Sequence, residues 1–274
     1  IMPSLVGSEM CIRDRDMNIT KYVCVDWKAL VDVIDALGGL DLDLTKEEVH
    51  WVNGYITETA NSIGYPCDAL KGEGRVHLNG VQAVSYSRIR YTSGDDFLRA
   101  SRQRIVLQAI LEKCKGEDIA TLTSMCSSMM DDISTNFTVK EILALAKNVT
   151  KYQISSTTGF PYNVATKELS GVGDTVIPID LATDVVQLHK YLFEDESYTV
   201  SDTVQSISDT VQKKTDVDSK TDIYDTTKYN NTAGSTGTEG AKKKNKDAQD
   251  ALKKSQSESE NDSTTKSSSD DSDD

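Results

Sequence analysis

Between Asn18 and Leu44, the apolar residues change from strand spacing to helical spacing and back again. Residues 22–26 alternate as in a short strand, and apolar residues then recur at helical intervals from Trp27 to Leu37. We expect this helix to end at the glycine pair that follows, because glycine readily adopts the left-handed conformation that closes helices. Alternation returns over 40–44. A strand, a helix and a strand in about 25 residues predict a βαβ-like unit in a layered sheet.

Helical spacing dominates much of the chain beyond this unit. The pattern predicts helices over 47–61, from Asp95 or Asp96 onward, and over 119–130, 139–152 and 180–193. Thr138 and Glu141 have the spacing of a capping box at the start of one of these helices. Residues 154–178 combine extended segments with turns. The elements together predict an α/β protein, a layered α-β-α domain with a central mixed sheet.

The composition of the chain changes after about Thr215. Ser, Thr, Asp, Lys and Asn dominate from there, and no aliphatic or aromatic residue lies beyond Leu252. Such a segment cannot bury enough apolar surface to offset the entropy lost on ordering. Residues 214–274 are therefore predicted to be a disordered polar tail that follows a domain over 16–213.

The first fifteen residues do not read as a targeting segment. They lack the basic start and the apolar centre of a secretory signal. Residues 1–15 resemble a translated sequencing adaptor, and we expect them to be a non-native artefact; a disordered native N terminus is the other interpretation. No stretch of about 18 apolar residues occurs anywhere, so the sequence predicts no membrane span.

Five arginines gather in one segment of an acidic protein. The formal net charge is −14 and the pI is about 4.7, which argues against a nucleic-acid partner. Segment 78–107 nevertheless contains only two acids, Asp95 and Asp96, against Arg88, Arg90, Arg99, Arg102 and Arg104. Because guanidinium groups bind phosphate bidentately, we expect an anionic ligand here. The other interpretation is a solvated face on which the arginines pair with nearby acids.

The local structure decides how the first two arginines point. If residues 86–91 are extended, alternation places Tyr86, Arg88 and Arg90 on one face, where two guanidinium groups can bind adjacent phosphoryl groups. If the segment is helical, Arg88 and Arg90 splay apart.

The helix that follows adds further candidates. On this helix Asp96, Arg99 and Gln103 lie at i, i+3 and i+7, on one face. Arginines beside a helix N terminus suit a diphosphate better than a single carboxylate, because the helix dipole also favours concentrated negative charge.

The same segment contains the patterns L-N-G-x-Q-A-x-x-Y-x-R-x-R and D-F-x-R-x-x-R-Q. Together with residues 18–23 and 30–40, in the same order and spacing, they resemble the LytR-CpsA-Psr family of cell-envelope proteins. The resemblance covers approximately residues 16–213. It implies a phosphotransferase that moves a polyprenyl-pyrophosphate-linked anionic glycopolymer, of the teichoic acid or capsule type, to peptidoglycan or another wall acceptor through a phosphodiester.

The resemblance also implies roles for individual residues. Arg88, Arg90 and Arg99 are expected to be catalytic residues at the pyrophosphate, together with Asp96 as the carboxylate that positions the site. Substrate binding is expected of Arg88, Arg90, Arg99, Arg102 and Gln103. A divalent cation, Mg²⁺ or Mn²⁺, is implied at the pyrophosphate, with metal ligands unknown.

Family members begin with a membrane helix, a strand and an Ile-Pro-Arg-Asp-like motif that supplies further site residues. Nothing similar precedes Asn18. The chain is therefore expected to be the C-terminal part of a domain that is anchored in the cell membrane on its extracellular face, and to lack transferase activity as given. The alternative is a non-catalytic protein that binds polyprenyl phosphate or wall polymer and regulates envelope assembly.

Other residue types give weaker indications. The three histidines lie in unlike contexts and form no visible triad or zinc pattern, and His189 is expected to be a packing residue. Four cysteines remain when Cys11 is set aside, and these allow three disulfide pairings or free thiols. Trp51 and Tyr55 are expected to pack on each other or on the core rather than to form a lipid groove.

Overall fold

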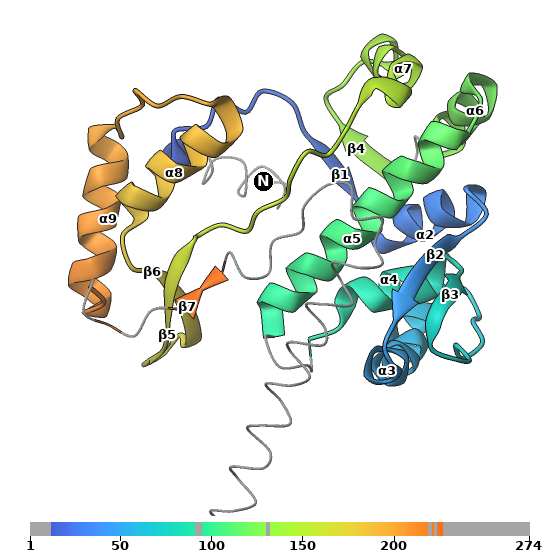
Figure 1. Ribbon diagram of the computed structural model, residues 1–274, viewed down its shortest axis with the longest axis horizontal. Helices are drawn as coiled ribbons and strands as arrows, with labels where there is room; N and C mark the ends of the chain where they lie inside the picture. The colour runs from blue at the N-terminus through green and yellow to red at the C-terminus, as the bar shows by residue number, and fades with distance from the viewer. Residues whose placement is uncertain (1–11, 91–94, 130–131, 219–220, 222–223, 227–274) are drawn as a thin grey trace, which may run out of the picture. The chain divides into compact units, whose positions relative to one another are not determined.

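The computed structural model describes residues 12–90, 95–129, 132–218, 221 and 224–226 (Figure 1). Its helices and small antiparallel sheets confirm the α/β class. Contacts divide the chain into two compact units. Unit 1 takes its described residues from 1–26, 126–148 and 157–230, and unit 2 takes them from 27–125 and 149–156.

Unit 2 is built from helices around one β-hairpin (Figure 1). In the hairpin, β2 pairs antiparallel with β3, with Leu40 opposite Leu78 and Leu44 opposite Gly74. The elements are α2 (Trp27–Ala36), β2 (Leu40–Leu44), α3 (Lys46–Ile63), β3 (Gly74–Leu78), α4 (Gly80–Arg88), α5 (Asp95–Gly116), the first part of α6 (Ile119–Met129), and the 3-10 turn η2 (Val149–Lys151).

Local signals in the sequence set where these helices begin. Capping boxes start both α3, with Thr45 and Glu48, and α4, with Asn79 and Gln82. The first residue of α4 must be small, because a Cβ atom on Gly80 would lie 2.4 Å from the carbonyl oxygen of Val31. Helix α4 therefore lies directly on α2.

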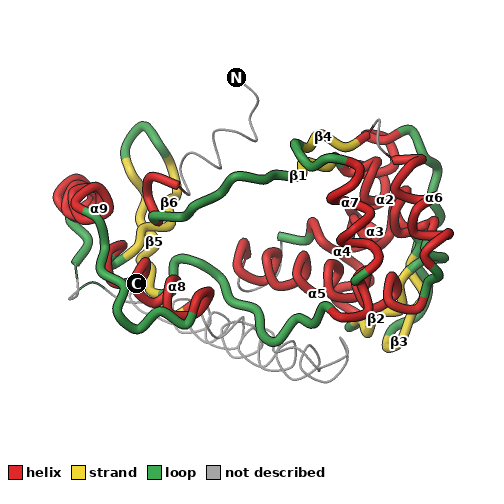
Figure 2. The backbone as a smooth tube through the Cα atoms, turned by 90° about the horizontal axis from the view of Figure 1, so that it is seen from above, coloured by secondary structure: helices red, strands yellow, loops and turns green. Residues whose placement is uncertain are grey.

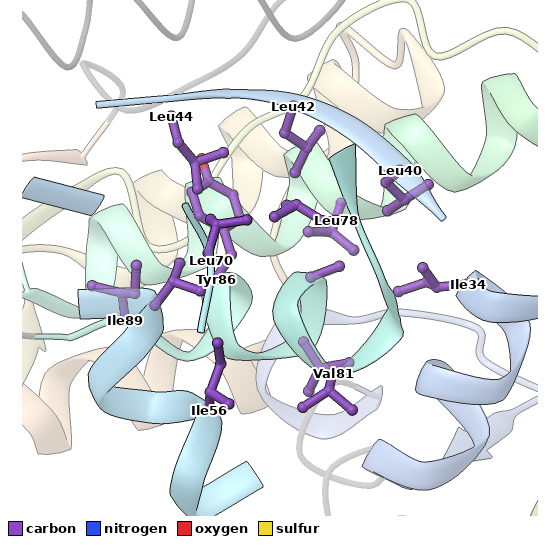
Figure 3. Packing of buried hydrophobic residues seen from close by; sticks show 14 of the residues in the cluster. Ile34, Leu40, Leu42, Leu44, Ile56, Leu70, Leu78, Val81, Tyr86 and Ile89 are labelled. Carbon is purple, nitrogen blue, oxygen red and sulfur yellow. The ribbon is translucent and has the colours of Figure 1, made fainter. Parts of the chain in front are cut away.

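The core of unit 2 follows from strict alternation along β2. Leu40, Leu42 and Leu44 project from this strand into the same apolar cluster as Leu78 and Tyr86 (Figure 3). All five side chains are at most 3% exposed. Burial of each large apolar side chain contributes about 1.5–3 kcal/mol, so this cluster joins the hairpin to the helices that cover it.

A buried ion pair connects three helices of unit 2. Nε of Arg102 on α5 lies 3.1 Å from Oε1 of Glu48 on α3, and both side chains are almost fully buried. The Arg102 guanidinium carbon also lies 5.9 Å from the ring centroid of Tyr86 on α4. Burial, with the nearby Glu48 charge, raises the pKa of Tyr86 above its ordinary value, so its hydroxyl stays protonated. The pair therefore ties α3, α4 and α5 together.

We predict that Arg102→Ala lowers the free energy of unfolding by about 3–5 kcal/mol, because it leaves the Glu48 carboxylate buried without its guanidinium. Urea denaturation measures the loss. The control is Lys113→Ala, which removes a longer and more exposed pair with Asp41, at 3.9 Å. This control is expected to cost at most about 1 kcal/mol. Equal losses in the two variants would contradict the prediction.

The described residues of unit 1 include two small antiparallel sheets and the helices α7, α8 and α9. Strand β5 lies between β6 and β7, and β1 pairs with β4. Helices α8 and α9 pack on each other next to β5 and β6 (Figure 2). The elements are β1 (Val23–Val25), β4 (Ile133–Thr135), α7 (Val139–Lys147), β5 (Asn163–Leu169), β6 (Gly173–Pro178), α8 (Leu181–Phe193), α9 (Asp202–Thr215) and β7 (Tyr224–Asp225).

The predicted βαβ unit is wrong in its pairing, although its elements exist. Strand β1 pairs with β4, whereas β2 pairs with β3, so the two strands that flank α2 belong to different sheets. The described strands form three small antiparallel sheets in place of one central mixed sheet. Periodicity indicates that a segment is extended, but the partner of a strand depends on residues far away in the chain.

The predicted start of the polar tail is also wrong. Helix α9 extends to Thr215, Val217 is 1% exposed within an apolar cluster, and the backbone of β7 pairs with β5. Thr215, Val217 and residues 224–226 thus belong to the folded unit. The expected disorder of 227–274 falls outside the described residues.

The N-terminal segment of unit 1 is fixed to the last two helices. The Asp16 carboxylate accepts hydrogen bonds from the Tyr198 hydroxyl at 2.6 Å and from the Ser201 backbone N–H at 2.9 Å. The His189 ring stacks on Tyr198 with ring centroids 3.7 Å apart, and its Nε2 atom lies 2.8 Å from the Arg15 carbonyl oxygen. These contacts confirm His189 as a packing residue. The artefact origin of residues 1–15 stays a prediction.

Two further expectations concern cysteines and membrane spans. Cys24, Cys67, Cys114 and Cys126 form no disulfide with one another, so none of the three pairings is formed. None of the helices in the described ranges combines the length and the apolar character needed to cross a bilayer.

Asp184 is a buried carboxyl group at the joint between α8 and β5. It accepts a hydrogen bond from the Tyr162 backbone N–H at 3.2 Å and another from Asn163. Burial raises its pKa from the ordinary value of 3.8 to about 7, more than these hydrogen bonds lower it. The unfolded chain loses this proton near the ordinary value and the folded chain keeps it, so stability falls as pH rises through this window.

We predict that Asp184→Asn raises the free energy of unfolding by on the order of 2 kcal/mol at about pH 8, because asparagine cannot ionise in the buried position. At about pH 4, where aspartate is protonated in the folded state, the two proteins should differ little. Chemical denaturation followed by circular dichroism at both pH values measures the effect. A stabilisation of equal size at both would show that ionisation is not its cause.

Candidate functional site

One cavity of unit 2 brings most of the predicted site residues together. Its volume is about 560 Å³, and residues of α2, α3, α4 and α5 line it. The lining residues are Trp27, Leu30, Tyr55, Ser87, Arg88, Arg90, Arg99, Gln103, Val106 and Leu107. The predicted convergence of Arg88, Arg90, Arg99 and Gln103 is confirmed, whereas their catalytic and binding roles stay predictions.

The end of α4 aims the first two arginines. Arg88 is the last helical residue, and Ile89 leaves the helix with ψ near 124° while its side chain is fully buried. Burial of Ile89 anchors the chain between the two arginines, and Arg88 and Arg90 both line the cavity. Of the two alternatives for residues 86–91, the helical one holds from Tyr86 to Arg88, and Tyr86 is buried in the core. The two arginines nevertheless do not splay apart.

Two aromatic rings and two hydrogen-bond acceptors contact the Arg88 side chain, which is only 12% exposed. Its guanidinium carbon lies 3.7 Å from a ring centroid of Trp27 and 5.5 Å from that of Tyr55, which are cation–π contacts. Nη1 donates to Oγ1 of Thr59 at 2.7 Å, and Nη2 donates to Oε1 of Glu58 at 2.6 Å. The guanidinium plane is therefore fixed before any ligand arrives.

Helix α5 supplies the other polar lining residues. Arg99 and Gln103 are four residues apart and so lie on one face, and Val106 and Leu107 continue the lining one turn further on. The side chain of Asp96 lies outside the described residues, and its positioning role stays a prediction.

The prediction that Arg102 binds substrate requires correction. Its side chain is only 4% exposed and is paired with Glu48 in the core. It directly precedes the cavity residue Gln103 on α5, and its side chain lies in the interior of the unit, where it contacts Glu48 on α3. Arg102 lies in the core next to the cavity, and it stabilises the cavity by joining helices that form it.

Sequence reasoning missed four residues around Arg88, namely Trp27, Tyr55, Glu58 and Thr59. Trp27 fits the apolar face of α2, but it is 44% exposed. Tyr55, Glu58 and Thr59 are at helical spacing on α3, so they share one face, and this spacing is the signal that could have found them. Tyr55 packs against the core as expected and also lines the cavity. Trp51 packs against the core and does not line the cavity.

The charges and walls of the cavity favour a phosphorylated ligand with an apolar part. Arg88, Arg90 and Arg99 offer guanidinium groups suited to phosphoryl oxygens, and the apolar lining residues can contact hydrocarbon. The described lining contains no carboxylate. Within the described ranges no group of three or more His, Cys, Asp or Glu side chains can hold a metal ion. These residues by themselves therefore do not fit a divalent cation.

The fold and the cavity together define the class, an α/β protein with an arginine-lined cavity suited to phosphoryl groups. The profile of the LytR_cpsA_psr family matches residues 8–185, and the chain belongs to this family. The family resemblance inferred from the arginine segment is thereby confirmed.

Relatives with assigned functions are similar over about half of the chain. A polyisoprenyl-teichoic acid–peptidoglycan teichoic acid transferase, TagV of Bacillus subtilis (strain 168), is 29% identical over 129 residues, which are 46% of this chain and 31% of the relative. The transferase TagU of Bacillus mycoides (strain KBAB4) is 31% identical over 134 residues, 47% of this chain and 38% of the relative. The matched part thus spans about a third of the length of these relatives.

Solved structures share the fold. A Streptococcus agalactiae protein aligns with a TM-score of 0.51 at 24% identity, over 70% of this chain and 63% of the other. A protein described as a transcriptional regulator, from Enterococcus faecalis, aligns with a TM-score of 0.51 at 18% identity, over 77% and 74% of the two chains. At these identities the likeness concerns architecture alone.

Proposed function

We propose that the arginine-lined cavity binds the pyrophosphate of a polyprenyl-linked anionic glycopolymer, of the teichoic acid or capsule type. The protein would then transfer this polymer to peptidoglycan or another wall acceptor through a phosphodiester. The observation that carries the proposal is the convergence of Arg88, Arg90 and Arg99 next to an apolar wall. The names of the curated relatives, which are teichoic acid transferases acting on peptidoglycan, support it.

The proposed reaction is a phosphoryl transfer. A hydroxyl group of the acceptor attacks the phosphorus atom that carries the polymer, and the bond from this phosphorus to the bridging oxygen of the pyrophosphate breaks. Polyprenyl phosphate leaves with the bridging oxygen, and the attacking hydroxyl loses its proton to a base. Arg88, Arg90 and Arg99 stabilise the negative charge on the pyrophosphate oxygens and on the leaving phosphate. Gln103 can donate an amide N–H to the same oxygens.

The apolar lining has a separate role in the proposal. Trp27, Leu30 and Leu107 contact the first isoprene units, so the phosphates are held at the arginines while the hydrocarbon stays out of water. The acceptor peptidoglycan lies outside the cell membrane, which places the proposed site at the extracellular face.

A divalent cation, Mg²⁺ or Mn²⁺, is part of the proposal only as a partner of the pyrophosphate. Such a cation usually takes one or two carboxylate ligands besides phosphate oxygens. Asp96 is the carboxylate that the family motif suggests, and its side chain lies outside the described residues. We therefore assign no reaction step to a metal.

We predict that Arg90→Ala and Arg99→Ala each weaken the binding of geranyl pyrophosphate at least about tenfold, because a hydrogen bond to a charged group contributes about 1.5–3 kcal/mol. Isothermal titration calorimetry on the full chain, with and without magnesium, measures the affinity. Lys113→Ala is the control, since this lysine does not line the cavity. Unchanged affinity in both arginine variants would remove the cavity as the pyrophosphate site.

A turnover assay separates transfer from binding alone. It follows the release of polyprenyl phosphate from a lipid-linked glycopolymer in the presence of peptidoglycan. Release supports the transferase. Binding of the lipid-linked glycopolymer with no release would favour the non-catalytic alternative, a protein that holds a phosphorylated lipid or polymer.

A further inference from the structure

The partners of Arg88 in the cavity differ in kind. Thr59 and Trp27 contact it with a neutral oxygen and an aromatic face, whereas Glu58 contacts it with a carboxylate. Of these three partners, the Glu58 carboxylate is the most similar to a phosphoryl group, because both carry anionic oxygens.

The two hydrogen-bond partners also differ in how firmly they are held. Thr59 is fully buried, so its hydroxyl cannot move far from the Arg88 guanidinium. The side chain of Glu58 is 63% exposed, at the outer side of the pair. An exposed glutamate can rotate into water at small cost, since exposed ion pairs stabilise proteins only weakly. A ligand can therefore displace Glu58 while Thr59 stays in place.

We propose that Glu58 is a built-in competitor for Arg88, whose carboxylate occupies the Nη2 donor that a phosphoryl oxygen of the ligand would take. This inference rests on the proposed function of the cavity and concerns the control of its affinity. Binding of a pyrophosphate then includes the loss of the Glu58 contact, and Glu58 lowers the affinity of the site.

The remaining contacts keep Arg88 in position when Glu58 leaves. Stacking on Trp27 fixes the plane of the guanidinium, and the bond from Nη1 to Thr59 fixes its rotation within that plane. The donor released by Glu58 thus stays preorganised for a phosphoryl oxygen. A lowered affinity matters for a transferase, because the phosphorylated product must leave before the next substrate binds.

The test compares Glu58→Gln with the wild-type full chain. Glutamine keeps a neutral oxygen for Arg88 and removes the charge that competes with and repels the ligand. We expect Glu58→Gln to tighten the binding of geranyl pyrophosphate by about two- to fivefold, the range that exposed ion pairs are worth. At about 1 M salt, where the Debye length is about 3 Å, the difference between the two proteins should shrink.

Two further variants serve as controls. Glu73→Gln makes the same change of charge at an exposed position of unit 2 that does not line the cavity, and it should leave the affinity unchanged. Thr59→Val removes the other hydrogen-bond acceptor of Arg88 and should weaken binding, in the direction opposite to Glu58→Gln. Thermal unfolding of each variant shows whether its fold is kept.

The possible outcomes distinguish the two proposals. Binding by the wild type with tighter binding by Glu58→Gln supports the competitor. Binding by the wild type with equal or weaker binding by Glu58→Gln overturns it and leaves the proposed function intact. An absence of binding in both proteins overturns the proposed function and the competitor with it.

Discussion

The buried pair between Arg102 and Glu48 is the interaction on which the geometry of the cavity depends. It joins α5 to α3, and through the Tyr86 ring it reaches α4. The same three helices carry most of the lining residues. Because both charges are removed from water, their separation is costly and the helices are held in one arrangement. An ion pair that does not line the cavity thereby sets the distances between the residues that do.

The end of α4 places two arginines, Arg88 and Arg90, in one cavity. Two arginines separated by one residue share a face in a strand and diverge in a helix. Here α4 ends at Arg88, and the buried side chain of Ile89 anchors the turn between the arginines. Both arginines line one cavity as a result. The stacking partner Trp27 and the hydrogen-bond partner Thr59 then remove the remaining freedom of Arg88, so a ligand meets a preformed donor.

The cavity is an arginine cluster in a chain with a net charge of −14. Distant acids are screened by salt, so the charges that matter for a ligand are those within a few ångströms of the arginines. Glu58 is a carboxylate that the structure places on one of the lining arginines, Arg88. The arginines of the sequence pattern, Arg88, Arg90 and Arg99, are also the arginines that line the cavity. The proposed phosphorylated ligand rests on both observations.

Local features were determined by the sequence itself. The strand at Leu40–Leu44, the capping boxes and the family patterns around Arg88 were predictable, because they depend on residues within a few positions of one another. Tertiary structure alone decided the pairing of β1 with β4 and the burial of Val217. It also decided which of two arginines on α5 is buried and which lines the cavity. Arg99 lines the cavity and Arg102 is buried, although their local sequence signals are alike. Their difference arises from the buried carboxylate of Glu48, which lies 54 positions from Arg102 in the chain and becomes its neighbour only when the helices pack.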